Sequence, residues 1–322
     1  MRRENGFNRR TKVKHLVRGL YLMLVMTLFA VHAEANYVFT QIDVPGSFFT
    51  EASAINNAGQ ILGTSGDGLG NNQTFLLNAG VFTTISVPID SFSPAGINNA
   101  GQIVGRIGVV HSFLADGGVV TPINVPGSIF TGANAINDGS TIAGTFTDST
   151  SHGFLLVSGS FTTVNVPGSS ATEVNGLNNV GQFVGDFIDP MGDHGFLADA
   201  SGFTAIDIPG SFFVAAMGIN DVGDIVGDYT NLTGLHGFVL SGGVLTTLDF
   251  PAGPGAPNIT WAAGINNAGE VIGWYYDSNF DAHGYAATLQ AATVPEPSTL
   301  ALFVGGLAVL LRLGLKRRFM KV

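Results

Sequence analysis

The sequence predicts an all-β protein, a six-bladed β-propeller closed by its own N-terminal strand. Three observations predict it: a unit of about 42 residues occurs six times, each unit divides into four short strands, and the array has no helical periodicity. Four strands in a unit of this length is the size of one propeller blade. An open β-solenoid is the alternative architecture.

Three landmarks define the unit. The first is an Ile-Asn-Asn-Ala-Gly-Gln-Ile-Val-Gly motif, whose leading asparagines are 42, 39, 41, 42 and 46 residues apart. The second is a His-Gly-Phe-like triplet, replaced by Gln73-Thr74-Phe75 in the first unit, and the third is a Phe-Thr-x-Ile-x-Val-Pro-Gly segment. The leading asparagines are Asn56, Asn98, Asn137, Asn178, Asn220 and Asn266, and the triplets begin at His111, His152, His194, His236 and His283.

The fourth unit illustrates the elements in order. Residues 161–166 are rich in β-branched side chains and stop at Pro167, which cannot continue a ladder. A second strand runs into Leu177, and residues 178–181 form a turn because Asn and Gly tolerate positive φ. Residues 182–187 form the third strand, and residues 194–198 form the fourth.

The two ends of the array complement each other. Residues 38–45 have the pattern of a unit's first strand, whereas residues 283–289 have the pattern of a fourth strand with no Pro-Gly segment after it. If these ends pair, the N-terminal strand completes the last blade. A closed ring leaves no open edge for aggregation, and a solenoid would have no use for this permutation.

Three segments divide the chain. Residues 1–35 have a basic beginning, a short apolar run and small residues near Ala35, as in a secretory signal peptide. Residues 36–292 form the propeller domain. Residues 293–322 form a tail in which an apolar run, Leu300 to Leu311, precedes a basic end; it predicts a short transmembrane helix. The chain has no cysteine, so no disulfide stabilises it.

The propeller domain is strongly acidic. Between Asn36 and Thr293, 20 acidic residues face a single basic residue, Arg106, so the formal net charge is −19. Such a surface repels phosphate backbones and excludes nucleic acid as a partner. It is compatible with divalent cations, cationic partners or a hydrated matrix, and solubility alone is the simpler explanation. Arg106 is expected to pair with a nearby carboxylate.

The repeated polar residues are expected to be structural. The leading asparagines should bond their own turns, and the glycines that end the motif should permit close packing between blades or a bulge. In several units an Asp precedes the histidine, as with Asp148 and His152 or Asp189 and His194. These four are candidate metal ligands, but capping of a turn is the preferred explanation. No cofactor is predicted; calcium stays open, although no Asp-x-Asp-x-Asp-Gly loop occurs.

The last unit departs most from the repeat. It holds both tryptophans, Trp261 and Trp274, together with Tyr275 and Tyr276. Flat aromatic side chains stack on sugar rings, so these four are the candidate ligand-binding residues. Alternatively, the aromatics fill the seam where the ring closes.

The tail resembles the PEP-CTERM sorting signal of Gram-negative bacteria. The resemblance rests on Pro295-Glu296-Pro297, the apolar run and the basic cluster of Arg312, Lys316, Arg317 and Arg318. It implies recognition by an exosortase-type membrane protease and export to the cell surface or extracellular matrix, where such systems accompany exopolysaccharide. A permanent membrane anchor is the alternative. The array also resembles bacterial extracellular HAF repeats, with His-Gly-Phe in place of His-Ala-Phe.

No catalytic signature is present: there is no Gly-x-Ser-x-Gly elbow, no His-Glu-x-x-His and no phosphate-binding loop. We therefore expect an exported, non-catalytic surface or matrix protein that interacts with exopolysaccharide or the cell surface. The alternative is a propeller enzyme, a glycan lyase or hydrolase. A central pocket that gathers carboxylates from different blades would favour the enzyme, and an aromatic platform without them would favour binding.

Overall fold

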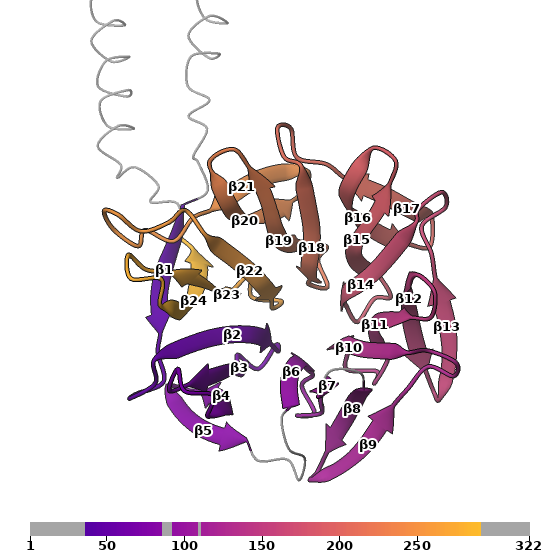
Figure 1. The fold of residues 1–322 in the computed structure, drawn as a ribbon, viewed down its shortest axis with the longest axis horizontal. Coiled ribbons are helices and arrows are strands. Elements are labelled where there is room, and N and C mark those ends of the chain that lie inside the picture. The colour runs from indigo at the N-terminus through magenta and orange to yellow at the C-terminus, as the bar shows by residue number, and fades with distance from the viewer. Residues whose placement is uncertain (1–35, 86–91, 109–110, 291–322) are drawn as a thin grey trace, which may run out of the picture. The chain divides into compact units, whose positions relative to one another are not determined.

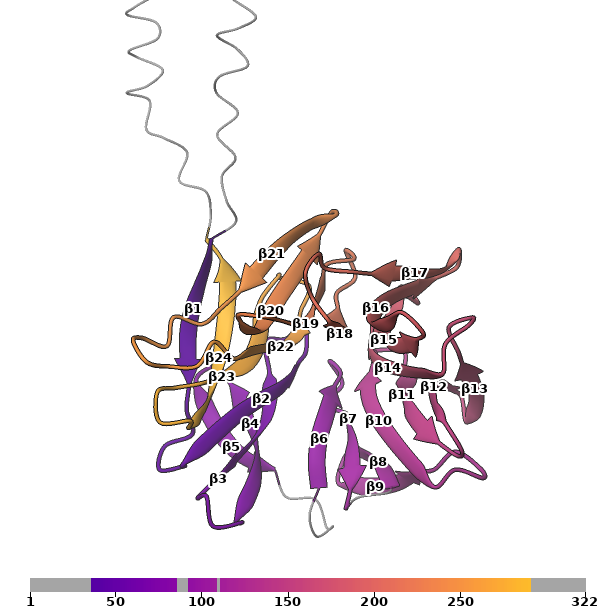
Figure 2. The same ribbon diagram turned by 45° about the horizontal axis from the view of Figure 1, so that its top comes forward.

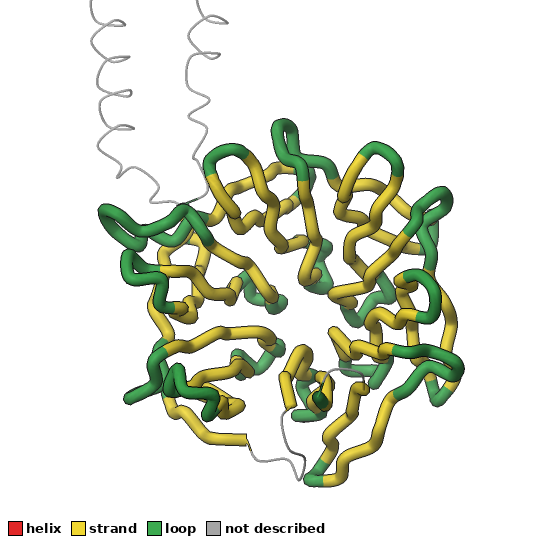
Figure 3. The backbone as a smooth tube through the Cα atoms, viewed as in Figure 1, coloured by secondary structure: helices red, strands yellow, loops and turns green. Residues whose placement is uncertain are grey.

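The computed structural model describes residues 36–85, 92–108 and 111–290, and within these ranges every regular element is a β-strand. The strands form six four-stranded antiparallel sheets arranged around a common axis, as Figure 1 and Figure 2 show. Tight turns and loops join the strands (Figure 3). The described residues contain no helix that is long and apolar enough to cross a membrane. The six-bladed propeller is thereby confirmed, and the solenoid is excluded.

The strand bounds follow, from the innermost to the outermost strand of each blade. Blade 1 contains β2 (Phe49–Ile55), β3 (Ile61–Gly66), β4 (Asn72–Asn78) and β5 (Val81–Ile85); blade 2 contains β6 (Phe92–Ile97), β7 (Ile103–Ile107), β8 (His111–Asp116) and β9 (Val119–Ile123). Blade 3 contains β10 (Phe130–Ile136), β11 (Ile142–Thr147), β12 (Ser151–Val157) and β13 (Ser160–Val164); blade 4 contains β14 (Ala171–Leu177), β15 (Phe183–Asp189), β16 (Gly192–Asp199) and β17 (Gly202–Ile206). Blade 5 contains β18 (Phe213–Ile219), β19 (Ile225–Asn231), β20 (Gly234–Ser241) and β21 (Val244–Leu248); blade 6 contains β22 (Thr260–Ile265), β23 (Val271–Tyr276), β24 (Ala282–Leu289) and β1 (Tyr37–Ile42).

The N-terminal strand closes the ring, as the order of the motifs predicted. β1 pairs antiparallel with β24 from Tyr37 opposite Leu289 to Ile42 opposite Gly284. His283 on β24 also contacts the carboxylate of Asp43, just after β1, at 3.0 Å. The last blade is thus built from both ends of the described chain, and each of the six sheets has four strands.

The repeated glycine is required inside the blade. A Cβ on Gly273 would collide with the carbonyl oxygen of Trp261 on the neighbouring strand and approach Tyr285, and the equivalent glycines of the other blades are similarly crowded. Beside each of these glycines the innermost strand carries a β-bulge, for example between Ala262 and Gly264. The expected bulge is therefore present, while the close approach occurs between strands of one blade rather than between blades.

The core lies between neighbouring blades. One cluster joins Val184 of blade 4 to Val214 and Phe238 of blade 5, and others repeat this arrangement around the ring. The aromatic residue of each triplet is almost completely buried, which explains why the repeat retains it: Phe75, Phe113, Phe154, Phe196, Phe238 and Tyr285. Burying an aromatic side chain of this size stabilises the fold by roughly 1.5–3 kcal/mol.

Several predictions fall outside the described residues. The signal peptide at residues 1–35 does so, as does the tail at residues 293–322 with its transmembrane helix. The tail's sorting residues Pro295, Glu296, Pro297, Arg312, Lys316, Arg317 and Arg318 lie there too.

Candidate binding cavity on the propeller axis

A cavity of about 570 Å³ lies on the propeller axis and receives side chains from all six blades. Its volume falls within the range of roughly 300–1,000 Å³ that is typical of small-molecule sites. Its lining residues include Ser53, Ala95, Arg106, Asn134, Glu173, Asn175, Asp186, Met217, Asp228, Trp261, Ala263 and Trp274. The lining mixes an aromatic wall with acidic and amide groups.

Two repeat positions supply most of this lining. The first is the bulge of each innermost strand, which turns Ser53, Ala95, Asn134, Asn175, Met217 and Ala263 toward the axis. The second is the residue that follows the repeated glycine, which is Arg106 in blade 2, Asp186 in blade 4, Asp228 in blade 5 and Trp274 in blade 6. The scaffold is therefore constant, and the chemistry of the cavity is set by what stands at these two positions.

Beyond the bulges, apolar side chains narrow the axis. Ile55, Ile97, Ile136, Leu177, Ile219 and Ile265 surround a smaller space of about 90 Å³ that continues from the cavity. Past this apolar girdle lies a polar space of about 70 Å³, lined by the asparagine turns. The wide cavity thus narrows toward the asparagine turns.

The leading asparagines cap their own turns and link neighbouring blades. Asn98 Oδ1 accepts hydrogen bonds from the backbone N–H groups of Ala100 and Gln102, which is the turn-capping role predicted. Its Nδ2 also donates to the carbonyl oxygen of Asn137 in the next blade, at 3.1 Å. The same hydrogen bond between blades is made by Asn56, Asn137, Asn178 and Asn220. This link between blades is a second role of the asparagines that the sequence did not indicate.

Three carboxylates converge on one side of the cavity, on blades 4 and 5. Glu173 lies directly opposite Asp186 in the register of β14 and β15. Asp186 accepts one hydrogen bond, from Asn175 Nδ2 at 2.8 Å. Burial, with a smaller repulsion from Glu173, raises the pKa of Asp186 to about 7; burial and repulsion from Asp186 raise that of Asp228 to about 7. Burial also raises the pKa of Glu173.

The aromatic wall comes from blade 6. Trp261 and Trp274 face each other across β22 and β23 and stack with ring centres 5.2 Å apart and planes 17° apart. Tyr276 packs edge-on against Trp261 at 5.6 Å, behind the cavity lining. Tyr285 Oη donates to the Trp261 carbonyl oxygen at 2.8 Å, so the tyrosine that replaces phenylalanine in this triplet holds the Trp261 backbone.

Tyr275 belongs to the core and not to the cavity. Successive strand residues point to opposite faces, so Tyr275 points away from Trp274 and Tyr276. It is 4% exposed and stacks on Phe250 with ring centres 3.6 Å apart, in the cluster that joins blades 5 and 6 and against which the closing strand packs. The two alternatives for the aromatics of the last unit thus apply to different residues: the tryptophans line the cavity, and Tyr275 fills the seam.

Arg106 does not pair with a carboxylate as expected. Among the described residues its guanidinium makes no ion pair within 4 Å; it lies 5.6 Å above the Phe130 ring and contacts Asn134 Oδ1 at 3.4 Å. The side chain therefore packs against blade 3, and its guanidinium group lines the cavity.

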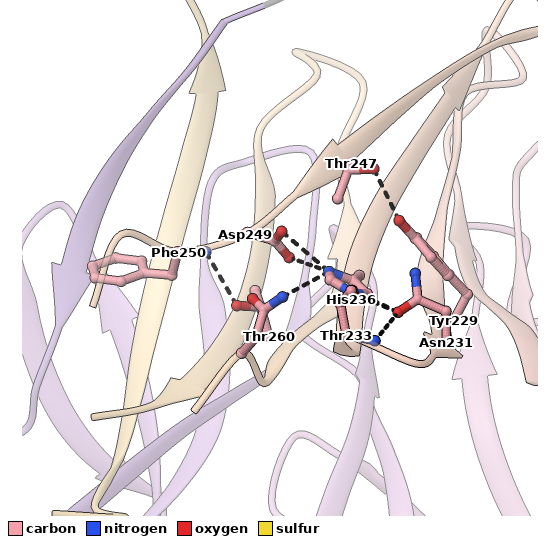
Figure 4. A network of polar contacts seen from close by, with 9 residues as sticks. Tyr229, Asn231, Thr233, His236, Thr247, Asp249, Phe250 and Thr260 are labelled. Atoms are coloured by element: carbon pink, nitrogen blue, oxygen red, sulfur yellow. Dashed lines mark hydrogen bonds and ion pairs between the residues drawn. The ribbon is translucent and has the colours of Figure 1, made fainter. Parts of the chain in front are cut away.

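The repeated histidines lie away from the axial cavities; His236 is buried, His111 is exposed, and the other three are partly buried. Figure 4 shows the buried His236, whose Nδ1 contacts Asp249 at 2.8 Å and whose Nε2 contacts Thr233 Oγ1 at 2.8 Å. The ring stacks on Tyr229 at 5.0 Å. Each histidine thus ties its own strand to the end of the next strand, as the structural interpretation predicted.

The four candidate metal ligands form two separate pairs. His152 Nε2 lies 3.4 Å from Asp148, and His194 Nε2 lies 3.3 Å from Asp189. The part of the chain that the structure describes brings no three His, Cys, Asp or Glu side chains together in a metal-binding group. Asp148 and Asp189 accept backbone N–H hydrogen bonds within their loops, and the Nδ1 atoms of His152 and His194 contact Asn165 and Asp207.

Sequence reasoning identified part of the site. It singled out Trp261 and Trp274, which line the cavity, and Tyr276, which supports them. It missed the joint contribution of Glu173, Asp186 and Asp228. Asp186 and Asp228 could have been noticed by comparing the repeats at the residue after the repeated glycine. In an otherwise regular motif this residue differs between units: it is Thr64, Arg106, Thr145, Asp186, Asp228 or Trp274.

No protein-family model matches the chain, and no curated protein matches it. Among solved structures, the chain is similar to a streptogramin B lyase, with 15% identity and a TM-score of 0.49 over 80% of this chain and 100% of that chain. It is also similar to the Aleuria aurantia lectin in complex with Fucα1-6GlcNAc, with 12% identity and a TM-score of 0.46 over 76% of this chain and 96% of that chain. Similarity at this level concerns the fold and not the ligand.

Proposed function

We propose that the protein is an exported, non-catalytic surface or matrix protein that binds a saccharide, such as a segment of exopolysaccharide, in the axial cavity. The observation that carries this proposal is the half-buried Trp261–Trp274 pair beside buried polar groups in a cavity of about 570 Å³. A sugar ring has one apolar face and a rim of hydroxyl groups. The tryptophans can stack on the apolar face, and Glu173, Asn175 and Asp186 can form hydrogen bonds with the hydroxyl groups of the rim.

Export and sorting are supported by the sequence pattern. The proposed route is cleavage of the N-terminal signal and recognition of the Pro295-Glu296-Pro297 tail by an exosortase-type protease, after transient or permanent membrane anchoring. The strand pairing in blade 6 is compatible with this route. Leu289 pairs with Tyr37 at the end of blade 6 beside the turn of Asn266, whereas Trp261 and Trp274 lie toward its other end. The last described strand therefore ends away from the cavity residues.

An enzyme acting on glycans is the second candidate, and the carboxylates favour it. Glu173, Asp186 and Asp228 come from two different blades, and glycoside hydrolysis uses paired carboxyl groups of which one holds a proton near neutral pH. The cavity therefore meets the criterion for an enzyme, whereas its aromatic platform lies beside carboxylates and meets the criterion for binding only in part.

One titration separates the two candidates. The full-length protein, in a detergent without a sugar headgroup, is titrated with the producing organism's exopolysaccharide while heat and polymer length are followed together. Binding without shortening of the polymer is the expected result. Shortening would establish the enzyme instead, and no heat would overturn saccharide binding.

Trp274→Ala locates the site in the same titration. Loss of the stacking surface should weaken binding at least about tenfold, or ~1.4 kcal/mol. Phe48→Ala is the matched control, because Phe48 is an aromatic residue that is 57% exposed and does not line the cavity. Equal losses in the two variants would contradict a site in the cavity.

A further inference from the structure

The charges of the cavity are unevenly distributed. Its lining contains three carboxylates, from Glu173, Asp186 and Asp228, against the single guanidinium of Arg106. The carboxylates lie on blades 4 and 5, whereas Arg106 is on blade 2 and leans on Phe130 and Asn134 of blade 3. One side of the cavity is therefore anionic, and within the described ranges no lysine or arginine contacts it.

Asp228 is the group that most requires a partner. Its side chain lines the cavity, it is only 5% exposed, and its carboxylate makes no hydrogen bond or ion pair with any other described residue. Burial removes most of the water around this carboxylate, and no described protein donor replaces it, which makes its charge costly. Its position at the cavity wall lets a bound molecule supply that donor.

Donors are scarce around the neighbouring acids. Asn175 Nδ2 serves Asp186 at 2.8 Å and also the Ala216 carbonyl oxygen at 3.3 Å. This side of the cavity thus offers several acceptor oxygens and one shared amide donor. The complementary ligand group is an ammonium, which has three N–H donors, no acceptor and a positive charge.

We propose that the saccharide bound in the cavity carries a free amino group: a hexosamine unit whose ring stacks on Trp261 or Trp274 and whose ammonium pairs with Asp186 and Asp228. This inference rests on the proposed function and names its ligand class. The aromatic wall suits the same ligand, since indole faces attract both the apolar side of a pyranose ring and a nearby cation. The strongly acidic domain would attract such a cationic polymer.

Other sugars fit the same groups less well. A neutral or N-acetylated unit brings no charge to Asp228. A uronic acid could reach Arg106 but would bring a fourth carboxylate into the cavity. The amino sugar alone both neutralises the anionic side and satisfies its acceptors.

Binding should also release protons. Burial, with repulsion of Asp186 by Glu173 and of Asp228 by Asp186, holds a proton in the cavity near pH 7, and Asp193 and Arg106 are the other charged groups that act on these acids. An ammonium lowers the pKa of both carboxyl groups, because it stabilises their charged forms. Protons are therefore expected to leave as the ligand enters at mildly acidic pH.

The test uses the full-length protein and three matched oligomers: a β-1,4-linked glucosamine hexamer, its N-acetylated counterpart and the glucose counterpart. Both tryptophans of the chain line the cavity, so tryptophan fluorescence reports binding at this site directly. Calorimetry in buffers of different ionisation enthalpy counts the protons released. The glucosamine hexamer should bind at least tenfold more tightly than the other two, lose affinity in high salt and release protons.

Asp228→Asn should weaken binding of the glucosamine hexamer at least tenfold and reduce the proton release. Asp116→Asn is the matched control, because Asp116 is an exposed carboxylate that contacts Gln102 and does not line the cavity. Equal affinity for the three oligomers, or no binding of the glucosamine hexamer, overturns the inference. If exopolysaccharide binds while the glucosamine hexamer does not, saccharide binding stands and only the amino-sugar assignment fails; if neither binds, both fail.

Discussion

Asp228 combines three properties that seldom occur together at one residue. It is buried, it has no hydrogen-bond donor among the described side chains, and it lies beside Asp186, whose carboxyl group repels its charge. Each property disfavours the ionised form in the folded protein. In the unfolded chain the same carboxyl group ionises near its ordinary pKa of 3.8. Folding at neutral pH therefore carries an electrostatic cost at this residue.

The sign of the resulting pH dependence follows from proton uptake. Between about pH 4 and 7 the folded protein holds protons on Asp186 and Asp228 that the unfolded chain has lost, so stability falls as pH rises through this window. Asp228→Asn removes one ionisable group and should stabilise the protein by roughly 1–3 kcal/mol more at pH 8 than at pH 5. Melting temperatures at the two pH values measure this difference.

The comparison with the parent protein isolates Asp228. His194, whose pKa is raised by its hydrogen bond to Asp207, also loses stabilising charge as pH rises, but it does so in both proteins. An unchanged melting temperature of the variant at pH 8 would mean that Asp228 is solvated or paired in the folded protein.

Each blade contains the same irregularity, a β-bulge in its innermost strand opposite the repeated glycine of the second strand. The repeated glycine lets the innermost strand lie against the aromatic residue of the triplet, and the bulge beside it turns one side chain to the axis. The residue after the glycine then becomes the second cavity residue. The side chains at the bulge and after the glycine can therefore differ between blades without altering how the blade packs.

Gly273→Ala tests this account of the blade. The new Cβ would meet the Trp261 carbonyl oxygen, which is backbone and cannot swing away, so we expect a loss of roughly 2–4 kcal/mol in unfolding free energy. Saccharide binding should also weaken, because Trp261 and Trp274 flank this contact. Denaturant unfolding and the fluorescence titration measure the two effects.

Gly264→Ala is the matched control in the same blade. An added Cβ there meets nothing closer than 3.5 Å, and the equivalent residues of blades 1 and 3 are Ala54 and Ala135. It should change stability by well under ~1 kcal/mol. Equal destabilisation by both substitutions would show that the glycine serves backbone conformation and not close approach.

At the scale of the whole molecule, stability depends on closure of the ring. β1 supplies the outer strand of blade 6 and brings Phe39 against Phe250 and Tyr285, with ring centres 5.3 and 5.4 Å apart. Without β1, the edge of β24 would present unpaired backbone groups, and this apolar cluster would lie open. The ring is therefore expected to unfold as one cooperative structure.

Deletion of residues 37–42 tests the closure. The shortened protein should melt at a much lower temperature and associate through the free edge of β24, which light scattering coupled to size-exclusion chromatography detects. Val38→Thr, at a position that is 49% exposed, should leave both properties unchanged. A monomeric, fully stable deletion protein would contradict closure by β1.

The blade number, the strand order and the pairing of the two ends of the repeat array could all be predicted from the sequence. These follow from local chemistry repeated six times, because turn asparagines, β-branched strands and prolines act on their neighbours along the chain. It also singled out Trp261 and Trp274 as departures from the repeat. Only the tertiary structure decided that Glu173, Asp186, Asp228 and the tryptophans share one cavity, because residues far apart in sequence meet there only when the ring closes. It also decided that Tyr275 packs in the core and that Arg106 has no acidic partner among the described residues, since strand facing and distance across the axis arise from packing between blades.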